Sequence, residues 1–185
     1  MKELFEAVRA GDLSRVQSLV DADPTLAIFA ASILGETERL EQLLAANRAL
    51  ITAVSTDGWT PLHLSAFFGK TDAVRLLLNK GASVSARSTN DMRNTPLHAA
   101  AAGGHSAVVQ ILLDHGADAN ARQDAGWVAL HAAAQNGDVE SARALVAAGA
   151  EVSARADNHQ RPLDLALTKA HQSMVDFLEA NGASL

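Results

Sequence analysis

The sequence predicts an all-α protein, a solenoid of about six helix-turn-helix repeats, and two observations carry this prediction. The phrase Thr-Pro-Leu-His at residues 60–63 returns at 95–98, and weaker forms stand at 128–131 and 161–164, so that successive phrases end 35, 33 and 33 residues apart. Glycines follow in a fixed register, six residues after the first three phrases and eighteen after all four (Gly69, Gly104 and Gly137; Gly81, Gly116, Gly149 and Gly182). A period of about 33 residues therefore runs through most of the chain.

Each repeat is predicted to contain two short helices. Apolar residues recur at helical spacing in the second half of a repeat, as at Val74, Leu77 and Leu78. The proline of the phrase suits the first turn of a helix, because its missing N–H group is not needed there. The later Gly-Ala pairs suit a helix end that needs a positive φ angle. Both helices of a repeat therefore have local start and stop signals.

An irregular polar segment, which we call a finger, follows each Gly-Ala pair. Residues 83–94 and 118–126 are too polar and too short to form a third helix, and they are typical of a turn or hairpin. The step of 35 residues places two extra residues in the first of these fingers, where Met92-Arg93-Asn94 stands in place of a glycine turn. We expect this finger to protrude or to bend differently from its neighbours.

The repeats resemble the ankyrin repeat. The best matches are Asp-Gly-Trp-Thr-Pro-Leu-His at residues 57–63, and Thr-Pro-Leu-His-Ala-Ala at 95–100 followed by Gly-Ala-Asp-Ala-Asn-Ala at 116–121. The resemblance implies a turn-like finger followed by two antiparallel helices in every repeat. It also implies a concave face, built from fingers and first helices, that contacts partner proteins.

The register divides residues 1–185 into the parts of one domain. We expect an N-terminal capping repeat at 1–25, a degenerate repeat without the phrase at 26–54, repeats at 55–87, 88–122 and 123–155, and a C-terminal capping repeat at 156–185. A terminal repeat needs a polar outer face because no neighbour covers it. The last predicted helix meets this need with Gln172, Ser173, Asp176, Glu179 and Asn181.

Composition excludes several functional classes. Hydrophobic residues make up 48% and charged residues 19% of the chain, which is typical of a folded, soluble protein. The net charge of −6 argues against nucleic acid as a partner. The chain has no cysteine, and therefore no disulfide, thiolate zinc site or thiol nucleophile. No apolar run approaches the ~18 residues of a membrane span, and charges interrupt the start of the chain, so we expect a cytoplasmic protein.

No catalytic or metal-binding pattern stands out in the sequence. A nucleophile beside an oriented base, a G-x-S-x-G phrase and a Walker sequence are all missing, so we predict neither an enzyme nor a cofactor. His63, His98 and His131 share one repeat position, but successive repeats stack too far apart for them to bind one ion. The resemblance implies that these histidines bond to backbone groups of neighbouring fingers.

The few aromatic residues are the main candidates for partner contacts. Trp59 and Trp127 occupy the same finger position in two repeats, and Phe67 and Phe68 end a first helix. The resemblance places all four at the concave face, and rigid aromatic side chains are typical of binding hot spots. The alternative is local packing, in which the tryptophans support their own fingers and Phe67 fills a gap.

Arg87, Arg122 and Arg155, here called the arginine row, follow an alanine at the same position of three consecutive repeats. Their guanidinium groups suit an acidic partner. Alternatively they pair with nearby aspartates of the fingers, Asp91, Asp124 and Asp157. Exposed pairs of that kind contribute only ~0.2–1 kcal/mol each.

We therefore predict a monomeric, non-enzymatic module that binds another protein through its concave face. The predicted contacts are Trp59, Met92, Arg93, Asn94 and Trp127 from the fingers, Phe67, Phe68, Gln135 and Asn136 from first-helix ends, and the arginine row. Three alternatives stay open: a regulatory or inhibitory subunit of an enzyme, a scaffold without a natural partner and, last, a nucleic-acid binder. The sequence does not identify the partner.

Overall fold

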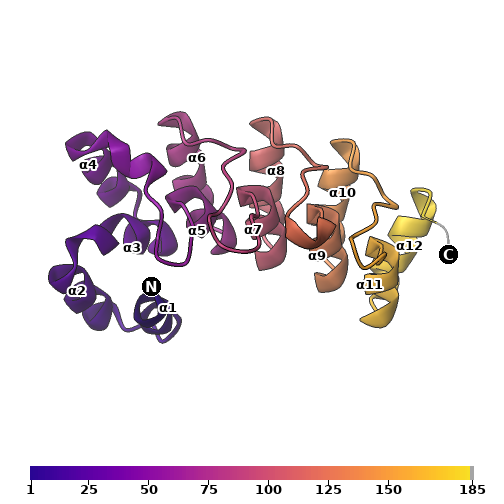
Figure 1. The fold of residues 1–185 in the computed structure, drawn as a ribbon, viewed down its shortest axis with the longest axis horizontal. Coiled ribbons are helices and arrows are strands. Elements are labelled where there is room, and N and C mark those ends of the chain that lie inside the picture. The colour runs from indigo at the N-terminus through magenta and orange to yellow at the C-terminus, as the bar shows by residue number, and fades with distance from the viewer. Residues whose placement is uncertain (184–185) are drawn as a thin grey trace.

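The computed structural model describes residues 1–183 as an elongated stack of helix pairs that runs from the N-terminal to the C-terminal end (Figure 1). This part of the chain contains twelve α-helices, three short 3-10 helices and no β-strand. The predicted all-α solenoid is therefore confirmed.

The helices form six pairs, each within one of the six segments expected from the sequence. The first helices are α1 (Lys2–Arg9), α3 (Ala27–Leu34), α5 (Pro61–Phe67), α7 (Pro96–Gly103), α9 (Ala129–Asn136) and α11 (Pro162–Thr168). The second helices are α2 (Leu13–Ala22), α4 (Thr37–Ala46), α6 (Thr71–Asn79), α8 (Ser106–Asp114), α10 (Val139–Ala147) and α12 (Gln172–Ala180). The 3-10 helices are η1 (Pro24–Leu26), η2 (Arg48–Thr52) and η3 (Asp124–Gly126).

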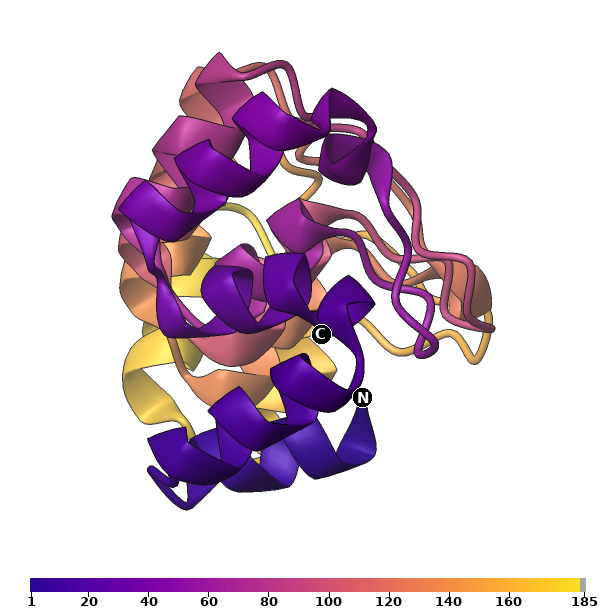
Figure 2. The ribbon, with the colours of Figure 1, turned by 90° about the vertical axis from the view of Figure 1, so that its left-hand side faces the viewer.

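From α3 onward the first and second helices form two layers, and the fingers project to one side (Figure 2). Leucines from both layers, such as Leu64 and Leu77, are fully buried between them. The first helices also bury small residues, among them Ala99, Ala100 and Ala101. Small side chains let neighbouring first helices approach closely, which keeps the interior close-packed.

Histidines at one repeat position link three first helices, α5, α7 and α9, each to the next finger. Nε2 of His63 lies 3.0 Å from the carbonyl oxygen of Asn94. The same bond joins His98 to Trp127 at 3.2 Å and His131 to Gln160 at 3.1 Å. The structural role that the resemblance implied for these histidines is confirmed.

The fingers are hydrogen-bonded turns that share one closing bond. The amide of Ser55 donates to the carbonyl of Trp59, and equivalent bonds close residues 88–94, 123–127 and 156–160, all at 2.9 Å. The finger at 88–94 keeps this bond although its loop is two residues longer. The two extra residues therefore lie between Ser88 and Asn94, in the loop that the bond closes. Arg93 takes a left-handed conformation, with φ of 46°, at the position that Gly58 occupies in the finger at residues 55–59.

The N-terminal helix pair lies below α3 and does not continue the two layers (Figures 1 and 2). Both α1 and α2 contact α3. Phe5 of α1 also reaches the end of α5, where its ring stacks on Phe68 with centroids 5.9 Å apart. The N-terminal pair therefore packs against α3 and against the end of α5.

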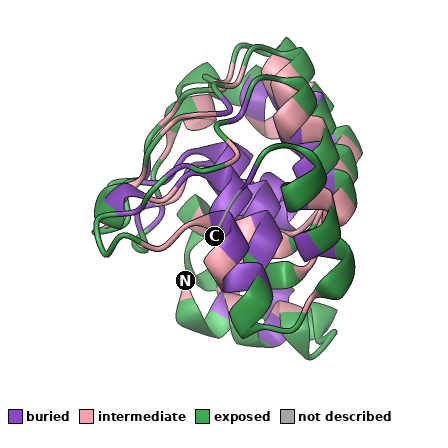
Figure 3. Cartoon of the chain, turned by 90° about the vertical axis from the view of Figure 1, so that its right-hand side faces the viewer, coloured by how far each residue is buried: buried purple, intermediate pink, exposed green. Residues whose placement is uncertain are grey.

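Figure 3 shows the C-terminal end of the stack coloured by burial, and α12 carries there the exposed polar residues that were expected. Gln172, Ser173, Asp176, Glu179 and Asn181 are all exposed, while Met174 and Leu178 of α12 are buried. Within residues 1–183, no helix combines the length and the hydropathy needed to cross a membrane.

Candidate partner-binding groove

Three consecutive repeats enclose a groove of about 180 Å³ where their fingers meet their first helices. We call it the aromatic groove. Its lining comes from three fingers and from α5, α7 and α9: Trp59, Phe67, Met92, Asn94, His98, Ala102, Gln123, Trp127, Val128, Ala132, Gln135 and Asn136. The concave side of the stack thus brings together seven of the residues predicted as partner contacts.

The two tryptophans both support their fingers and line the groove. Trp59 packs edge-on against Phe67, with centroids 5.2 Å apart, and Trp127 stacks on His131 at 5.3 Å. Trp59, Phe67 and Trp127 are nevertheless only half-buried. The binding and the packing alternatives are therefore compatible, since one part of each ring is packed and another part faces the groove.

Phe67 and Phe68 have different surroundings although they are adjacent in sequence. Phe67 lines the aromatic groove, whereas Phe68 does not. Phe68 instead stacks on Phe5 of the N-terminal pair. Helix α1 therefore covers part of Phe68, and Phe68 is not part of the aromatic groove.

The long finger contributes one exposed and one buried residue to the groove. Met92 is 46% exposed, but Asn94 is only 4% exposed, so its side chain lies deep in the structure and not on the surface that we expected. Among the described residues, Oδ1 of Asn94 has no hydrogen-bond partner. A buried acceptor without a partner costs about 1–3 kcal/mol. Arg93 is exposed beside the groove and does not line it.

His98 gives the groove a neutral floor. Its Nδ1 lies 2.8 Å from the hydroxyl of Thr95, and its Nε2 lies 3.2 Å from the carbonyl of Trp127, so both ring nitrogens are engaged. Burial lowers the pKa of His98 to about 4, and the positive charge of Arg87 adds to this effect. At neutral pH the ring therefore carries no charge.

On α9, Gln135 and Asn136 are exposed at the edge of the groove. Asn136 also has a structural role, because its Nδ2 donates to the carbonyls of Ala101 and Ala102 at 3.1 Å each. Sequence reasoning missed Ala102, which lines the groove from α7. Ala102 holds the same repeat position as Phe67 and Gln135, so the register could have identified it.

The arginine row bonds to backbone carbonyls of the fingers. Nη1 of Arg87 donates to the carbonyl of Arg93 at 2.9 Å and to that of Arg122 at 2.6 Å. Nη1 of Arg122 in turn donates to the carbonyl of Gly126 at 3.3 Å and to that of Arg155 at 3.0 Å. None of the ion pairs in residues 1–183 involves the row. Pairing with aspartates, one of the two alternatives, is therefore not the arrangement found. Arg87 and Arg122 instead join the finger at residues 88–94 to that at 123–127, and that one to the finger at 156–160.

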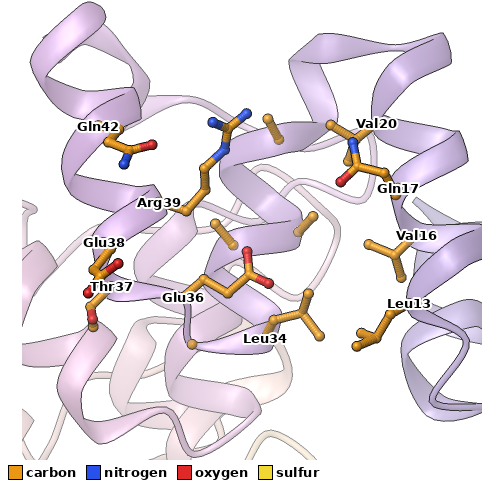
Figure 4. A pocket seen from close by; sticks show the side chains of 14 residues that line it. Leu13, Val16, Gln17, Val20, Leu34, Glu36, Thr37, Glu38, Arg39 and Gln42 are labelled. Carbon is orange, nitrogen blue, oxygen red and sulfur yellow. The ribbon is translucent and has the colours of Figure 1, made fainter.

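A second, wider cleft of about 830 Å³ separates α2 from α3 and α4 (Figure 4). Leu13, Val16 and Val20 form one wall, and Glu36 and Arg39 reach into the space from the opposite side. This cleft exists because the N-terminal pair does not stack squarely on the next repeat. It contains no aromatic side chain, and none of the predicted contacts lines it.

Within residues 1–183, no group of three or more His, Asp or Glu side chains is arranged to hold a metal ion.

The family model for ankyrin repeats matches four overlapping segments, residues 4–88, 27–123, 84–156 and 116–185. The chain belongs to the ankyrin-repeat family. Among similar curated proteins is the "Ankyrin repeat and SAM domain-containing protein 6" of Rattus norvegicus, which is 32% identical over 98 residues. The protein of the same name from Mus musculus matches equally well. The match covers 48% of this chain but only 11% of either relative.

Ankyrin repeats are in general protein–protein interaction modules, and proteins built from them are typically non-enzymatic. Family membership alone identifies no partner, because different surfaces can be carried on one framework. The choice of a binding surface on this ankyrin-repeat chain therefore depends on its own side chains.

Proposed function

We propose that this chain is a non-enzymatic module that binds a partner protein in the aromatic groove. The observation that carries the proposal is the convergence of Trp59, Phe67, Met92 and Trp127, all at least partly exposed, on one concavity between three repeats. Aromatic and methionine side chains are enriched at protein interfaces and account for much of their binding energy.

The groove is suited to binding because it is already formed. The tryptophan rings are held by contacts with Phe67 and His131. The arginine row joins the fingers at residues 88–94, 123–127 and 156–160, and the amide of Thr89 donates to the carbonyl of Gly58 in the finger of Trp59. A rigid surface loses little conformational entropy when a partner binds, so more of the contact energy appears as affinity. The wider N-terminal cleft lacks such anchors, and we do not assign binding to it.

The proposal is tested by affinity capture from a lysate of the source organism. The wild-type chain is compared with a Trp59→Ala, Trp127→Ala double variant and with Ala102→Arg, which fills the groove from an exposed position. A Leu78→Ala, Leu113→Ala double variant is the control, because these half-buried leucines hold equivalent positions on second helices. Circular dichroism establishes that each variant is folded.

We expect a protein that the wild-type chain and the leucine control retain and that both groove variants lose. Equal retention by all four chains would move the binding surface away from the groove. If nothing is retained specifically, the chain acts as a scaffold without a partner and the proposal is wrong.

A further inference from the structure

We propose that the N-terminal helix pair shapes the aromatic groove, with Phe5 of α1 as a positioning residue for the groove wall of Phe67 and Trp59. This inference rests on the proposed function and concerns the control of the same surface. Its starting point is a continuous series of ring contacts that runs from α1 to the groove. We call it the ring chain, and its members in order are Phe5, Phe68, Phe67 and Trp59.

Each contact of the ring chain has a geometry that aromatic rings prefer. The rings of Phe5 and Phe68 are stacked, with centroids 5.9 Å apart and planes 19° from parallel. Phe68 meets Phe67 edge to face at 5.4 Å and 81°, and Phe67 meets Trp59 in the same way at 5.2 Å and 82°. Stacked and edge-to-face pairs with centroids about 4.5–7 Å apart are the favourable arrangements. A ring that turns therefore loses a favourable contact with the next one.

Phe68 is a large residue at a position where the next repeats have small or polar ones. Gly103 and Asn136 hold the equivalent position in the two following repeats. Phe5 and Phe68 are both half-buried, and each covers part of the other. The ring of Phe68 therefore depends on α1 for one of its contacts, and Phe67 depends in turn on Phe68.

The N-terminal pair is attached to the stack differently from the later repeats. Residues 23–26 alone join α2 to α3, whereas residues 47–60 join α4 to α5 and contain a finger. Bonds between fingers, such as that from the amide of Thr89 to the carbonyl of Gly58, join the later repeats. The cleft of about 830 Å³ also separates α2 from α4 (Figure 4). The position of the N-terminal pair therefore depends on side-chain contacts such as that of Phe5.

The ring chain gives this pair an effect on the groove. While Phe5 lies on Phe68, the ring of Phe68 keeps one orientation, and Phe67 and Trp59 are supported from behind. Without Phe5, Phe68 can turn into the vacated space, and Phe67 loses its support on the side away from the groove. A wall held in one orientation loses little entropy when a partner binds. Phe5 should therefore raise the affinity of a groove that it does not line.

The two tryptophans allow the proposal to be tested at each end of the groove. Trp59 belongs to the ring chain, whereas Trp127 packs on His131, and the chain has no other tryptophan. A Trp127→Phe background reports on Trp59 alone, and a Trp59→Phe background reports on Trp127 alone. We would measure the emission maximum and the quenching by acrylamide of the full chain in both backgrounds, after circular dichroism has shown that each variant is folded.

Phe5→Ala should shift the emission of Trp59 to longer wavelength and increase its quenching, because the ring becomes more mobile and more exposed to solvent. The emission of Trp127 should not change. Phe5→Tyr keeps the ring and should leave both signals as in the wild type. Val8→Ala is the matched control and should also leave them unchanged, since Val8 is a half-buried residue of α1 that packs on the core outside the ring chain.

A double variant tests whether the effect passes through Phe68. Phe68→Leu removes the middle ring and should change the Trp59 signal as Phe5→Ala does. Adding Phe5→Ala to Phe68→Leu should then change the signal no further, because residues that act through one another are not additive. If Phe5→Ala does not fold, Phe5→Leu, which removes the ring but keeps an apolar side chain, takes its place in every comparison.

The affinity for the partner captured from the lysate is a second readout. Phe5→Ala should weaken it about two- to tenfold, which is the contribution of one aromatic pair expressed as a change in affinity. Phe5→Tyr and Val8→Ala should bind as the wild-type chain does.

An unchanged Trp59 signal in Phe5→Ala would overturn the inference. Equal changes of Trp59 and Trp127 would also overturn it, because they would indicate a general loosening of the stack. So would additive effects of the Phe5 and Phe68 variants, or an unchanged affinity for the partner. The two proposals fail separately: if the lysate yields no partner, the proposed function is wrong, but the Trp59 signal still decides whether the N-terminal pair shapes the groove.

Discussion

The buried histidines join neighbouring repeats in their neutral form. Burial lowers the pKa of both His63 and His98 to about 4, and it also lowers the pKa of His131. In the unfolded chain these groups return to about 6.5. Between pH 6.5 and pH 4 the unfolded state therefore binds more protons than the folded state, and acid favours unfolding.

We predict that the histidines contribute their whole stabilisation to the free energy of unfolding above pH 6.5. As the pH is lowered toward 4, this free energy should fall by about 1.4 kcal/mol per pH unit for each of His63 and His98. Urea denaturation at pH 7.5, 6 and 5 measures this. His63→Gln should reduce the slope. Equal urea midpoints at pH 7.5 and 5 would contradict the assignment.

A second prediction at the level of single residues concerns how much the arginine row stabilises the fold. Arg87→Ala removes two bonds to finger carbonyls and should lower the free energy of unfolding by about 1 kcal/mol. Arg75→Ala, on the exposed side of α6, is the matched control and should change it by less than about 0.5 kcal/mol. Identical unfolding curves for the two variants would show that the row does not stabilise the fingers.

Individual side chains were the least predictable part of the molecule. The repeat register correctly predicted that Trp59 and Trp127 lie at the same position of two fingers, and both line the aromatic groove. This is because the position of a residue within its repeat determines where it lies in the stack. It gave no indication that Asn94 is buried, since the two-residue insertion changes the finger just before it. The partners of the arginine row were also missed. They are backbone carbonyls of the next repeat, and because every residue has one, the sequence does not show which of them accepts the bond.

Helices were more predictable, because their boundaries depend on local signals. Thr60 and Thr95 cap α5 and α7, each with its hydroxyl 2.8 Å from Nδ1 of the histidine three residues later. At the start of α9 the equivalent residue is Val128, and only its backbone amide reaches His131, at 3.1 Å. Helix α9 therefore lacks one capping bond that α5 and α7 have.

We predict that Val128→Thr restores this bond and raises the free energy of unfolding by about 0.5–1 kcal/mol. Thr95→Val removes the same bond from α7 and should lower stability by a similar amount. Thermal or urea unfolding of the two variants measures both effects. A loss of stability in Val128→Thr would mean that the hydroxyl does not reach His131.

Gly103 tests how tightly neighbouring first helices pack. An alanine inside a helix normally stabilises it by about 0.5–1 kcal/mol relative to glycine. A Cβ atom at Gly103, however, would meet the carbonyl oxygen of Phe67 at 2.4 Å. We predict that Gly103→Ala destabilises the protein by about 1–3 kcal/mol, reversing the usual sign.

The control for Gly103→Ala is Ala102→Gly, at the adjacent exposed position of α7. It should cost only the helix propensity, about 0.5–1 kcal/mol. Stabilisation by Gly103→Ala would show that α5 and α7 can move apart without cost.

At the scale of the whole molecule, the stack from residue 26 onward follows from its period, because each repeat contacts its sequence neighbours. The placement of the N-terminal helix pair does not follow from the period. Residues 1–25 and 26–54 both lack the repeated phrase, but the helices at 26–54 still join the two layers, whereas the position of residues 1–25 depends on tertiary contacts such as that between Phe5 and Phe68. The wide cleft beside α2 could therefore not be predicted from sequence periodicity.

The central claim is that a partner protein occupies the aromatic groove. Hydrogen–deuterium exchange of the full chain, alone and with the captured partner, tests it most directly. We predict slower exchange on binding in the fingers at residues 88–94 and 123–127 and in α7 and α9, with unchanged exchange in α6, α8 and α10. Protection confined to those second helices, or to α2 and α4 around the N-terminal cleft, would contradict it.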